Sequence, residues 1–512
     1  MSSEKSSSVT GFVLIGVILL LFSWYNTKQY EKQVEGNRRY QDSIAAVEAE
    51  TAASAESVQA SGDTLSAEEA PLYQNSLINE ASTAEEKFVT IENDKLKMTV
   101  STKGAQPYSV LVKDYHYYDG SDLYLIRPEK SRFDLELNAD QWLNTDDLNF
   151  EVSYNSGNTL GMRLNFSDTS YIEAIYVLAE GSYLVDYTLN FVGMDKVLDP
   201  RTNSVTMDWV VDLPRMEKGY TNEKNYSAVA YRYSSNNDVK TIGQRKESVK
   251  ETFSSNLRWF GFQQQFFSAI LVAPQDFTGG TLVNKFYEEG QASGDLMQSG
   301  AEMTFQIDPR NAEFSVPFNF YFGPNHYYTL KSFNEGFEKI IPLGGKVIGS
   351  ISRYVVIPVF NWLSKYISSY GIIILILTIL IKVVISPLTL RSYKSSAKMK
   401  VLQPEIQKIN ERYPKQEDAM KRQQATMDLY NRAGVSMMGG CLPILLQFPI
   451  LWAMFRFFPA SFELRQQSFL WADDLSGYDS ILNLGFNIPL YGDHISLFAL
   501  LMGVSMWGYS KM

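Results

Sequence analysis

The chain has 512 residues and a formal net charge of −11 at pH 7, with one cysteine and three histidines. One cysteine excludes an internal disulfide and any multi-cysteine metal site, and three histidines leave little material for zinc binding or histidine catalysis. The acidic balance disfavours nucleic-acid binding, because a surface that follows phosphates needs clustered lysine and arginine. We therefore expect no metal, no cofactor and no directly bound nucleic acid.

Four apolar segments interrupt the polar chain and predict membrane spans. They lie at residues 10–25, 369–390, 437–458 and 495–511. The first is a little short for a hydrocarbon core of ~30 Å, but no small-residue cleavage site follows, so we interpret it as an uncleaved anchor rather than a signal peptide. The third contains Gly439, Gly440, Pro443 and Pro449, which a membrane helix tolerates because neighbouring helices satisfy the freed backbone groups.

The segment between the second and third spans sets the orientation. Residues 391–436 hold ten Lys or Arg against five acids, so the positive-inside rule places them in the cytoplasm. Alternation then places residues 1–9 in the cytoplasm and the region before the second span outside. The basic residues between Lys28 and Arg39 argue weakly the other way, and we let the larger bias decide. This predicts a multi-pass protein with a large external domain and a loop at 459–494 on the same external side.

The external region divides into a linker and a β-rich domain. Residues 41–86 are rich in Ala, Ser and Glu and offer too little apolar surface to offset their ordering entropy, so we expect a disordered tether over 26–87. A helix is the alternative, but we find no apolar stripe to dock it. From residue 88 to about 345, period-two alternation and frequent turn residues predict a large antiparallel β-sandwich. Residues 256–273 could begin as a helix and end as a strand.

His116 and His326 lie in this domain, and each precedes two tyrosines. They would support acid–base catalysis only with a carboxylate at hydrogen-bonding distance, and isolated histidines are more often ordinary surface or packed residues. Residues 351–368 mix apolar and aromatic side chains with charges, and we interpret them as a helix lying at the external membrane interface. A connector packed on the β-domain is the alternative.

The cytoplasmic segment predicts a hairpin of two helices, because apolar side chains recur at helical spacing on both sides of Pro414. These side chains are Leu402, Ile406, Ile409, Tyr413, Met420, Met427 and Tyr430. Each seam is thin, so we expect a mobile and largely solvated hairpin. Its charged surface could dock a ribosome or targeting factors.

Lys382 is an ionisable residue inside the second span, roughly 16 Å past Gly371 at the rise of a helix. A charge at that depth costs about 2.5–3.5 kcal/mol on insertion scales. Thr378 is four residues earlier on the same helical face, and Gln447 could add a polar group from the third span. Together they indicate a water-filled notch. The alternative is that the Lys382 side chain extends along its four-carbon stem to the cytoplasmic surface.

Several motifs resemble the YidC family of membrane protein insertases, in its Gram-negative form with a large periplasmic domain. They are PLT at 387–389, SAKM at 396–399, LQPEIQ at 402–407, GGCLPILLQFPI at 439–450, ELRQ at 463–466, WADDLS at 471–476 and LMGVSM at 501–506. The order of anchor, tether and sandwich also resembles that branch, whose sandwich is related to sugar-mutarotase folds. The resemblance implies a membrane α-helical bundle plus a periplasmic mutarotase-like super-sandwich.

The resemblance further implies function. Family members insert and help fold inner-membrane proteins, alone or with the Sec translocon, and are not enzymes. A hydrophilic groove holds a basic residue that attracts the polar external segment of the substrate. That position falls on Lys382, where the family usually has Arg, so the charge is kept but the bidentate fork is lost. Thr378 and Gln447 match groove positions.

The apolar segment of the substrate slides along the third span into lipid. Candidates for this sliding face are Leu442, Phe448, Leu451 and Phe455. The family has two more spans after the segment that ends at Met512, so we expect a truncated chain that lacks two of the five groove walls.

Two other classes of function compete with the insertase. The first is a membrane-tethered periplasmic carbohydrate-binding or mutarotase-like protein, which requires His116 and His326 to converge with a carboxylate in one cleft. The second is a channel or transporter, which the absence of repeated halves disfavours.

Overall fold

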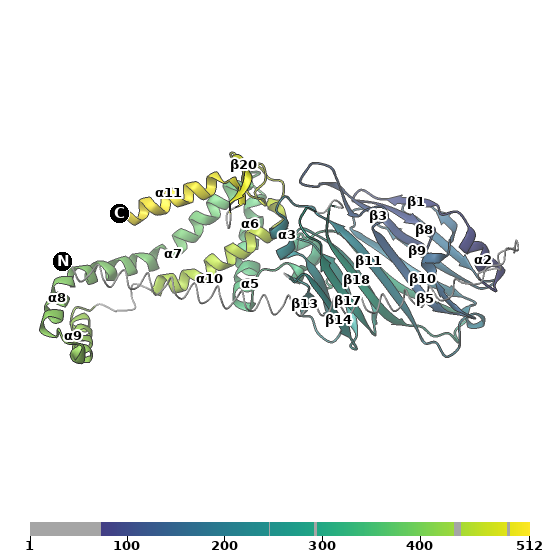
Figure 1. The fold of residues 1–512 in the computed structure, drawn as a ribbon, viewed down its shortest axis with the longest axis horizontal. Coiled ribbons are helices and arrows are strands. Elements are labelled where there is room, and N and C mark those ends of the chain that lie inside the picture. Colours follow the sequence, from purple (N-terminus) through teal and green to yellow (C-terminus); the bar gives the residue numbers. More distant parts are fainter. Residues whose placement is uncertain (1–72, 245, 291–293, 435–441, 489–491, 512) are drawn as a thin grey trace, which may run out of the picture. The chain divides into compact units, whose positions relative to one another are not determined.

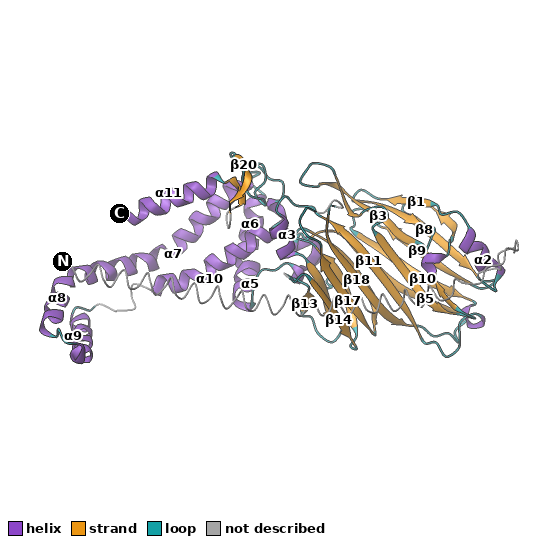
Figure 2. Ribbon diagram, viewed as in Figure 1, coloured by secondary structure: helices purple, strands orange, loops and turns teal. Residues whose placement is uncertain are grey.

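A computed structural model describes residues 73–511 apart from 245, 291–293, 435–441 and 489–491. The predicted first span at 10–25 and most of the predicted tether lie outside the described residues. Figure 2 shows that strands build the sandwich and that helices α5 to α11 form the C-terminal part of the chain.

Two large antiparallel sheets face each other in the sandwich (Figure 1), which confirms the predicted fold class. The nine-stranded sheet contains β7 (Glu151–Asn155), β8 (Thr159–Asn165), β9 (Tyr171–Leu178), β10 (Leu184–Val192), β12 (Ala228–Tyr233), β13 (Val239–Ile242), β15 (Leu257–Gln263), β16 (Phe267–Phe277) and β19 (Glu313–Pro324). The six-stranded sheet contains β5 (Ser131–Asn138), β6 (Trp142–Asn144), β11 (Ser204–Pro214), β14 (Ser248–Phe253), β17 (Gly279–Phe286) and β18 (Asp295–Gln306). A smaller sheet orders β1 (Phe88–Glu92), β2 (Leu96–Ser101), β3 (Gln106–His116) and β4 (Asp122–Ile126).

Alternation along the strands builds the core. Every second residue of β11 from Val205 to Leu213 is buried, and β10 repeats this pattern opposite. Trp209 of β11 contacts the rings of Phe262 and Phe320 in the other sheet, with centroids 4.8 and 5.3 Å away. Residues 256–273, left open by the sequence, form the β15–β16 strand pair, because both faces of these strands are buried.

The predicted tether ends earlier than residue 87, which corrects its boundary. Helix α2 (Ser76–Thr83) begins after Asn75, whose side chain accepts hydrogen bonds from the backbone N–H groups of Leu77 and Ile78. The Asn75 amide also donates to the Phe166 carbonyl at 2.9 Å, and Ile78 is buried. The Asn75 cap, the buried Ile78 side chain and hydrogen bonds from Asn149 to the Ala81 and Ala84 carbonyls therefore dock a segment for which no apolar stripe was evident.

Two short helices, α3 (Tyr220–Tyr226) and α4 (Tyr327–Ser332), lie beside the sandwich. The C-terminal part consists of α5 (Lys346–Ile351), a π-helical turn (Ser352–Val356), α6 (Ile357–Ser364), α7 (Tyr370–Val401), α8 (Gln403–Arg412), α9 (Ala419–Arg432), α10 (Leu442–Phe457) and α11 (Leu497–Lys511). By length and composition, 346–364 and 370–387 could each cross a membrane. Between α10 and α11, β20 (Leu482–Ile488) and β21 (Gly492–Ile495) form a two-stranded sheet that the sequence did not indicate.

Replacing Trp209 with alanine should destabilise the sandwich by about 3–5 kcal/mol, because a fully buried aromatic side chain leaves a cavity between two close-packed sheets. Trp142, which is 67% exposed on β6, is the matched control, and Trp142→Ala should change stability by less than about 0.5 kcal/mol. Denaturant unfolding followed by the circular dichroism of the sheets measures both. Similar losses in the two variants would contradict this account of the core.

Candidate functional site

The predicted groove residues Thr378 and Lys382 lie one turn apart on α7. Both are exposed, next to the packed stripe formed by Ile373, Leu377 and Ile385. The Thr378 hydroxyl donates to the Ile374 carbonyl at 2.8 Å, so the helix itself satisfies this polar group. Within the part of the chain that the structure describes, the Lys382 ammonium has no ion-pair or hydrogen-bond partner. It is also the only charged residue between Tyr370 and Pro387.

Helix α10 has one packed and one exposed face. The packed side includes Ala453, Met454 and Phe457, which are at most 8% exposed. The opposite side exposes large apolar side chains at helical spacing: Phe448, Leu451, Trp452 and Phe455. The three aromatic rings are neighbours, with the centroid of the Trp452 ring 5.5 Å from that of Phe448 and 5.8 Å from that of Phe455. We call these four residues the α10 stripe.

The structure brings three of the four predicted sliding residues onto this stripe. Leu442 is the first residue of α10, and its side chain is not among those described. Gln447 is half-buried at the border between the stripe and the packed face of α10. Among the described residues, no hydrogen bond joins Gln447 to Thr378 or Lys382.

The predicted hairpin seam needs correction on its second helix. Helices α8 and α9 contact each other, and α8 ends just before Tyr413 and Pro414. Leu402, Ile406, Ile409, Tyr413 and Tyr430 are half-buried, but Met420 is 82% exposed and Met427 is exposed too. The half-buried residues of α9 also include Arg422, Ala425 and Leu429, which the sequence prediction did not name. Neither helix has a fully buried residue.

The helices and the sandwich share one apolar core. Trp259, Ile270 and Tyr321 come from the nine-stranded sheet, and they pack in the same cluster as Phe360 of α6 and Phe457 of α10. The segment from α5 to Tyr366 buries one face in this core and exposes Tyr354, Trp362 and Tyr366 on the other. The first turns of α7, after Ser369, and the last turn of α10, before Phe458, belong to the same core as the sandwich residues.

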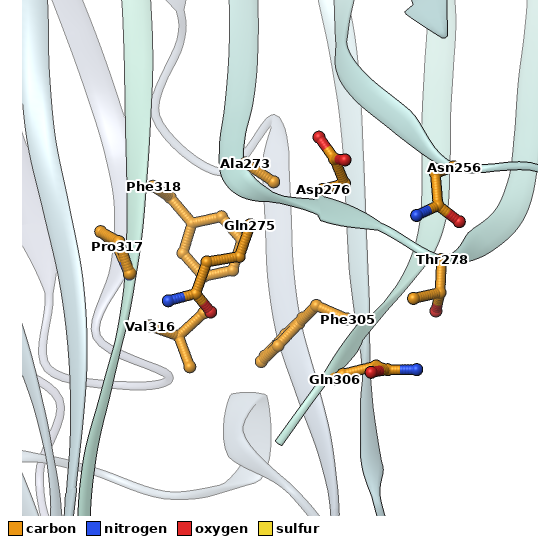
Figure 3. A pocket seen from close by; sticks show the side chains of 10 residues that line it. All are labelled: Asn256, Ala273, Gln275, Asp276, Thr278, Phe305, Gln306, Val316, Pro317 and Phe318. Carbon is orange, nitrogen blue, oxygen red and sulfur yellow. The ribbon is translucent and has the colours of Figure 1, made fainter. Parts of the chain in front are cut away.

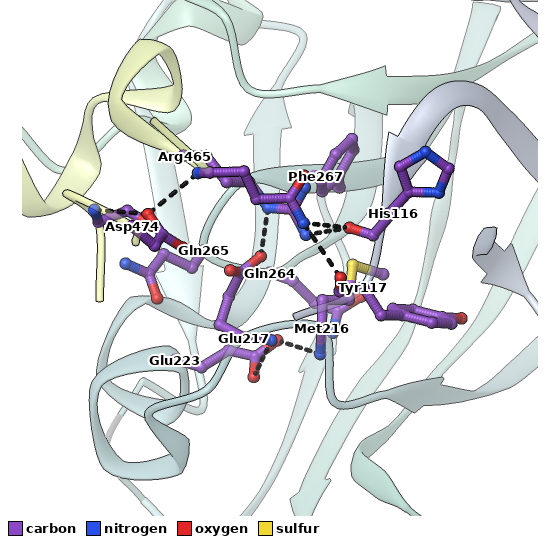
Figure 4. Close-up of polar contacts among 12 residues, drawn as sticks. His116, Tyr117, Met216, Glu217, Glu223, Gln264, Gln265, Phe267, Arg465 and Asp474 are labelled. Atoms are coloured by element: carbon purple, nitrogen blue, oxygen red, sulfur yellow. Dashed lines mark hydrogen bonds and ion pairs between the residues drawn. The ribbon is translucent and has the colours of Figure 1, made fainter. Parts of the chain in front are cut away.

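A buried ion pair lies beside this core (Figure 4). The guanidinium of Arg465, in the segment after α10, contacts the Glu217 carboxylate at 2.6 Å and donates to the His116 carbonyl at 2.6 Å. Its central carbon is 5.1 Å from the centroid of the Phe267 ring. The side chains of Arg465 and Glu217 are only 2% and 9% exposed. The pair joins residues 248 positions apart in the sequence.

A second buried carboxyl, Glu223 of α3, lies next to this pair. Burial and the neighbouring Glu217 raise the pKa of Glu223 to about 8, although the Met216 and Glu217 N–H groups donate to its oxygens. Burial also raises the pKa of Glu217, and Arg465 opposes that increase. With Glu223 neutral near neutral pH, the Glu217 carboxylate has Arg465 as its ion-pair partner, and the nearby Asp474 carboxylate adds to the increase in the pKa of Glu217.

A cavity of about 450 Å³ opens in the sandwich (Figure 3). Phe305, Phe318 and Val316 form its floor, and polar side chains such as Gln275 and Asn256 line the rim. Of its ten lining residues only Asp276 is titratable. His116 and His326 are absent from the lining and have separate carboxylate partners, Asp122 at 3.7 Å and Glu463 at 3.5 Å. His326 instead lines a separate cavity of about 350 Å³ with Glu463, so among the described residues the two histidines share neither a carboxylate nor the cavity of Figure 3.

Comparison with known proteins assigns the family. Residues 88–356 match the family model for the YidC periplasmic domain, and residues 362–512 match the model for the 60Kd inner membrane protein. The chain belongs to the YidC family. The membrane protein insertase YidC of Bacteroides fragilis is 41% identical over 509 residues, which cover 98% of this chain and 81% of that protein. The Parabacteroides distasonis insertase is 38% identical over 532 residues, with 99% and 83% covered.

Solved structures of low sequence identity resemble about half of the chain. A putative aldose 1-epimerase from Escherichia coli K12 gives a TM-score of 0.32 at 8% identity, covering 47% of this chain and all of that one. A galactose mutarotase-like protein from Lactobacillus casei gives 0.30 at 12% identity, covering 46% of this chain and all of that one. The family assignment of this insertase therefore comes from its sequence relatives, and the sandwich is its periplasmic domain.

Sequence reasoning missed the Arg465–Glu217 pair and the place of Trp452 in the stripe. Arg465 belongs to the ELRQ motif, which contributed to the resemblance, but no local pattern indicates a partner as distant as Glu217. Trp452 had a usable signal, because it is four residues after Phe448 and one after Leu451 on a predicted helix.

Glu223 should make the stability of the periplasmic domain depend on pH. Its pKa is about 8 in the folded chain against an ordinary value of 4.5, so between pH 4.5 and pH 8 the folded state retains a proton that the unfolded state has lost. The free energy of unfolding should therefore fall as pH rises from 5 to 8. Glu223→Gln should reduce that slope, whatever its effect on absolute stability.

Melting of the purified full chain in detergent, followed by circular dichroism at several pH values, measures the slope. Asp146→Asn is the matched control. Burial raises the pKa of Asp146 to about 6, so this carboxyl also makes the free energy of unfolding fall with rising pH, but at lower pH than Glu223. If Glu223→Gln and the parent chain have identical slopes, Glu223 is not the proton-binding group.

Proposed function

We propose that this insertase draws the polar external segment of a nascent membrane protein into a hydrophilic groove beside Lys382. The apolar segment of the substrate then passes along the α10 stripe into lipid. In this proposal the chain acts as a chaperone of insertion and does not make or break covalent bonds.

The observation that carries the proposal is the isolated cation on α7. An unpaired ammonium within an apolar span is costly unless water or an incoming anion solvates it. Thr378, one turn away, adds a hydroxyl, and Gln447 of α10 adds an amide that is half-buried. An acidic or polar substrate segment would be stabilised more at this position than in lipid, because the Lys382 ammonium attracts it and that attraction is strong where the dielectric constant is low.

The α10 stripe supports the second half of the proposal. Four large apolar side chains on one helix face have no covering partner among the described residues. They offer a surface against which an apolar helix can pack without desolvating polar groups. Trp452 belongs to this surface together with Phe448, Leu451 and Phe455.

The topology and partners follow from the same arrangement. We propose a multi-pass protein of the bacterial inner membrane, with spans at 10–25, 369–390, 437–458 and 495–511 and with 351–368 along the periplasmic interface. The basic hairpin of α8 and α9 would face the cytoplasm, where a ribosome or targeting factor delivers nascent membrane proteins. The Sec translocon and lipids are the other proposed partners.

Lys382→Ala should slow the insertion of a single-span substrate with a short acidic external segment. A lost attraction of about 1 kcal/mol corresponds to roughly a fivefold lower rate. Lys382→Arg should retain the rate, because the charge remains. Proteoliposomes containing each variant, with protease protection of the external segment as the readout, give the comparison.

A substrate whose acidic external residues are replaced by Asn and Gln is the control, and Lys382→Ala should hardly change its insertion. Equal insertion of the acidic substrate by the parent chain, Lys382→Ala and Lys382→Arg would remove the groove charge from the mechanism.

Deleting residues 405–430 should abolish most insertion of ribosome-delivered substrates while leaving the melting of the periplasmic domain unchanged. The reason is that α8 and α9 bury no residue, so they contribute little to the stability of the rest. Lys408→Gln, which breaks only the exposed 2.8 Å pair with Glu405, is the control and should insert normally. Full activity after the deletion would exclude a working role for the hairpin.

A further inference from the structure

Arg465 is a fully buried cation at a place where a surface loop would ordinarily lie. It follows the last residue of α10, Phe457, by eight positions. Removing a guanidinium from water is costly unless its donors are satisfied, and here Glu217 and the His116 carbonyl satisfy two of them while the Phe267 ring lies beside it. A charge retained under these conditions specifies one arrangement of the groups that surround it.

Neighbouring residues of the same segment are attached to the same part of the sandwich. Gln265 donates to the Pro459 carbonyl at 2.9 Å, two residues after α10 ends. Gln466 donates to the carbonyls of His116 and Tyr117, both at 3.0 Å. The Phe462 ring lies 5.4 Å from Tyr115 and 5.5 Å from Phe267. The segment from Phe458 to Gln466 is therefore fixed to the sandwich along its whole length.

We propose that Arg465 is a positioning residue of the insertase: its pair with Glu217 fixes the periplasmic end of α10 against the sandwich, and so holds the α10 stripe in place during insertion. The periplasmic domain then serves as a rigid support for the substrate-contacting helix. The proposal rests on the role assigned above to the stripe.

The need for such a support follows from the packing of α10. Its stripe is exposed and only its other face is packed, so side contacts restrain it on one side alone. Apolar contacts are also non-directional, and packed helices can shift past each other by a turn, about 5.4 Å, with little loss of buried area. A shift of that size would move the stripe relative to Lys382. A buried ion pair with a defined geometry opposes it.

The first test compares Arg465→Ala with Arg310→Ala in proteoliposomes. Arg310 is the matched control, because it is an exposed sandwich arginine whose partner is the nearby Asp308. Arg465→Ala should lower the insertion rate by about an order of magnitude, and Arg310→Ala should leave it unchanged. Arg465→Lys should fall between them, because one ammonium cannot serve Glu217 and His116 with the geometry of a fork. Normal insertion by Arg465→Ala would overturn the proposal.

A covalent bypass separates positioning from any other role of Arg465. In a Cys441→Ser background, which removes the single native cysteine, Tyr115→Cys and Phe462→Cys replace two side chains whose rings lie 5.4 Å apart, so a short bifunctional maleimide can join the two elements. Crosslinking should restore insertion to the Arg465→Ala variant, and the same variant treated with a monofunctional maleimide should stay impaired. An impaired variant that crosslinking fails to restore would overturn the proposal, since Arg465 would then act otherwise than by holding the two parts together.

If Arg465→Ala does not fold, Gln265→Ala replaces it in the same experiment, because it removes only the hydrogen bond to Pro459. The melting temperature of the sandwich decides which variant is used. The outcome is independent of the groove charge. If Arg465→Ala is impaired and rescued while the Lys382 variants insert normally, the groove charge is rejected and the positioning role of Arg465 is kept. If the Lys382 variants are impaired while Arg465→Ala inserts normally, only the positioning role is rejected.

Discussion

The apolar core shared by the nine-stranded sheet and the helices is the constraint on which the C-terminal part depends. Trp259, Ile270 and Tyr321 are side chains of a sheet, yet they pack in one cluster with Phe360 and Phe457. Burial of this kind provides most of the free energy of docking but little directional information. The Arg465–Glu217 pair and the amide contacts beside it supply the directional part, because each has only one good geometry. Apolar burial thus drives the association of the helices with the sandwich, and the ion pair and amide contacts fix their position on it.

The proposed membrane segments obey a different constraint, since lipid cannot satisfy polar groups. Thr378 meets it by donating to its own helix, and the backbone of α7 meets it by helical hydrogen bonding except at Pro387, which has no N–H to donate to the Val383 carbonyl. Lys382 does not meet it within the described chain. The single charged position of α7 between Tyr370 and Pro387 and the exposed apolar face of α10 are therefore surfaces of opposite character on helices that contact each other. In the proposed mechanism, a substrate with a polar segment and an apolar segment complements both.

The sequence was most informative where structure depends on local periodicity. Alternation predicts strands such as β10 and β11, and apolar runs predict α7, α10 and α11, because side-chain spacing alone decides which face is buried. It was least informative for docking. Helix α2 is held by a cap, a buried isoleucine and hydrogen bonds from Asn149, and the β20–β21 pair depends on cross-strand contacts that leave no period of their own. The sequence prediction placed Met420 and Met427 in the α9 seam because they are apolar, but both are exposed, and the half-buried positions of α9 include Arg422 and Leu429. Glu217 could not be identified as a site residue, since its partner follows it by 248 positions.

Burial along the helices decreases from the periplasmic end toward the hairpin. Ile373 and Leu377 of α7 are buried, whereas Val383, Val384, Leu390 and Val401 further along the same helix are exposed. α8 and α9 follow with no buried residue. Segments with few buried contacts open at low free energy, so motion should concentrate at the hairpin and decrease toward the sandwich. In the proposed mechanism, a substrate delivered to the hairpin meets the less buried end of the helices first, and the α10 stripe lies toward the end that is packed with the sandwich. An entry that can open and a recognition surface that is held in place would then lie toward different ends of the same helices.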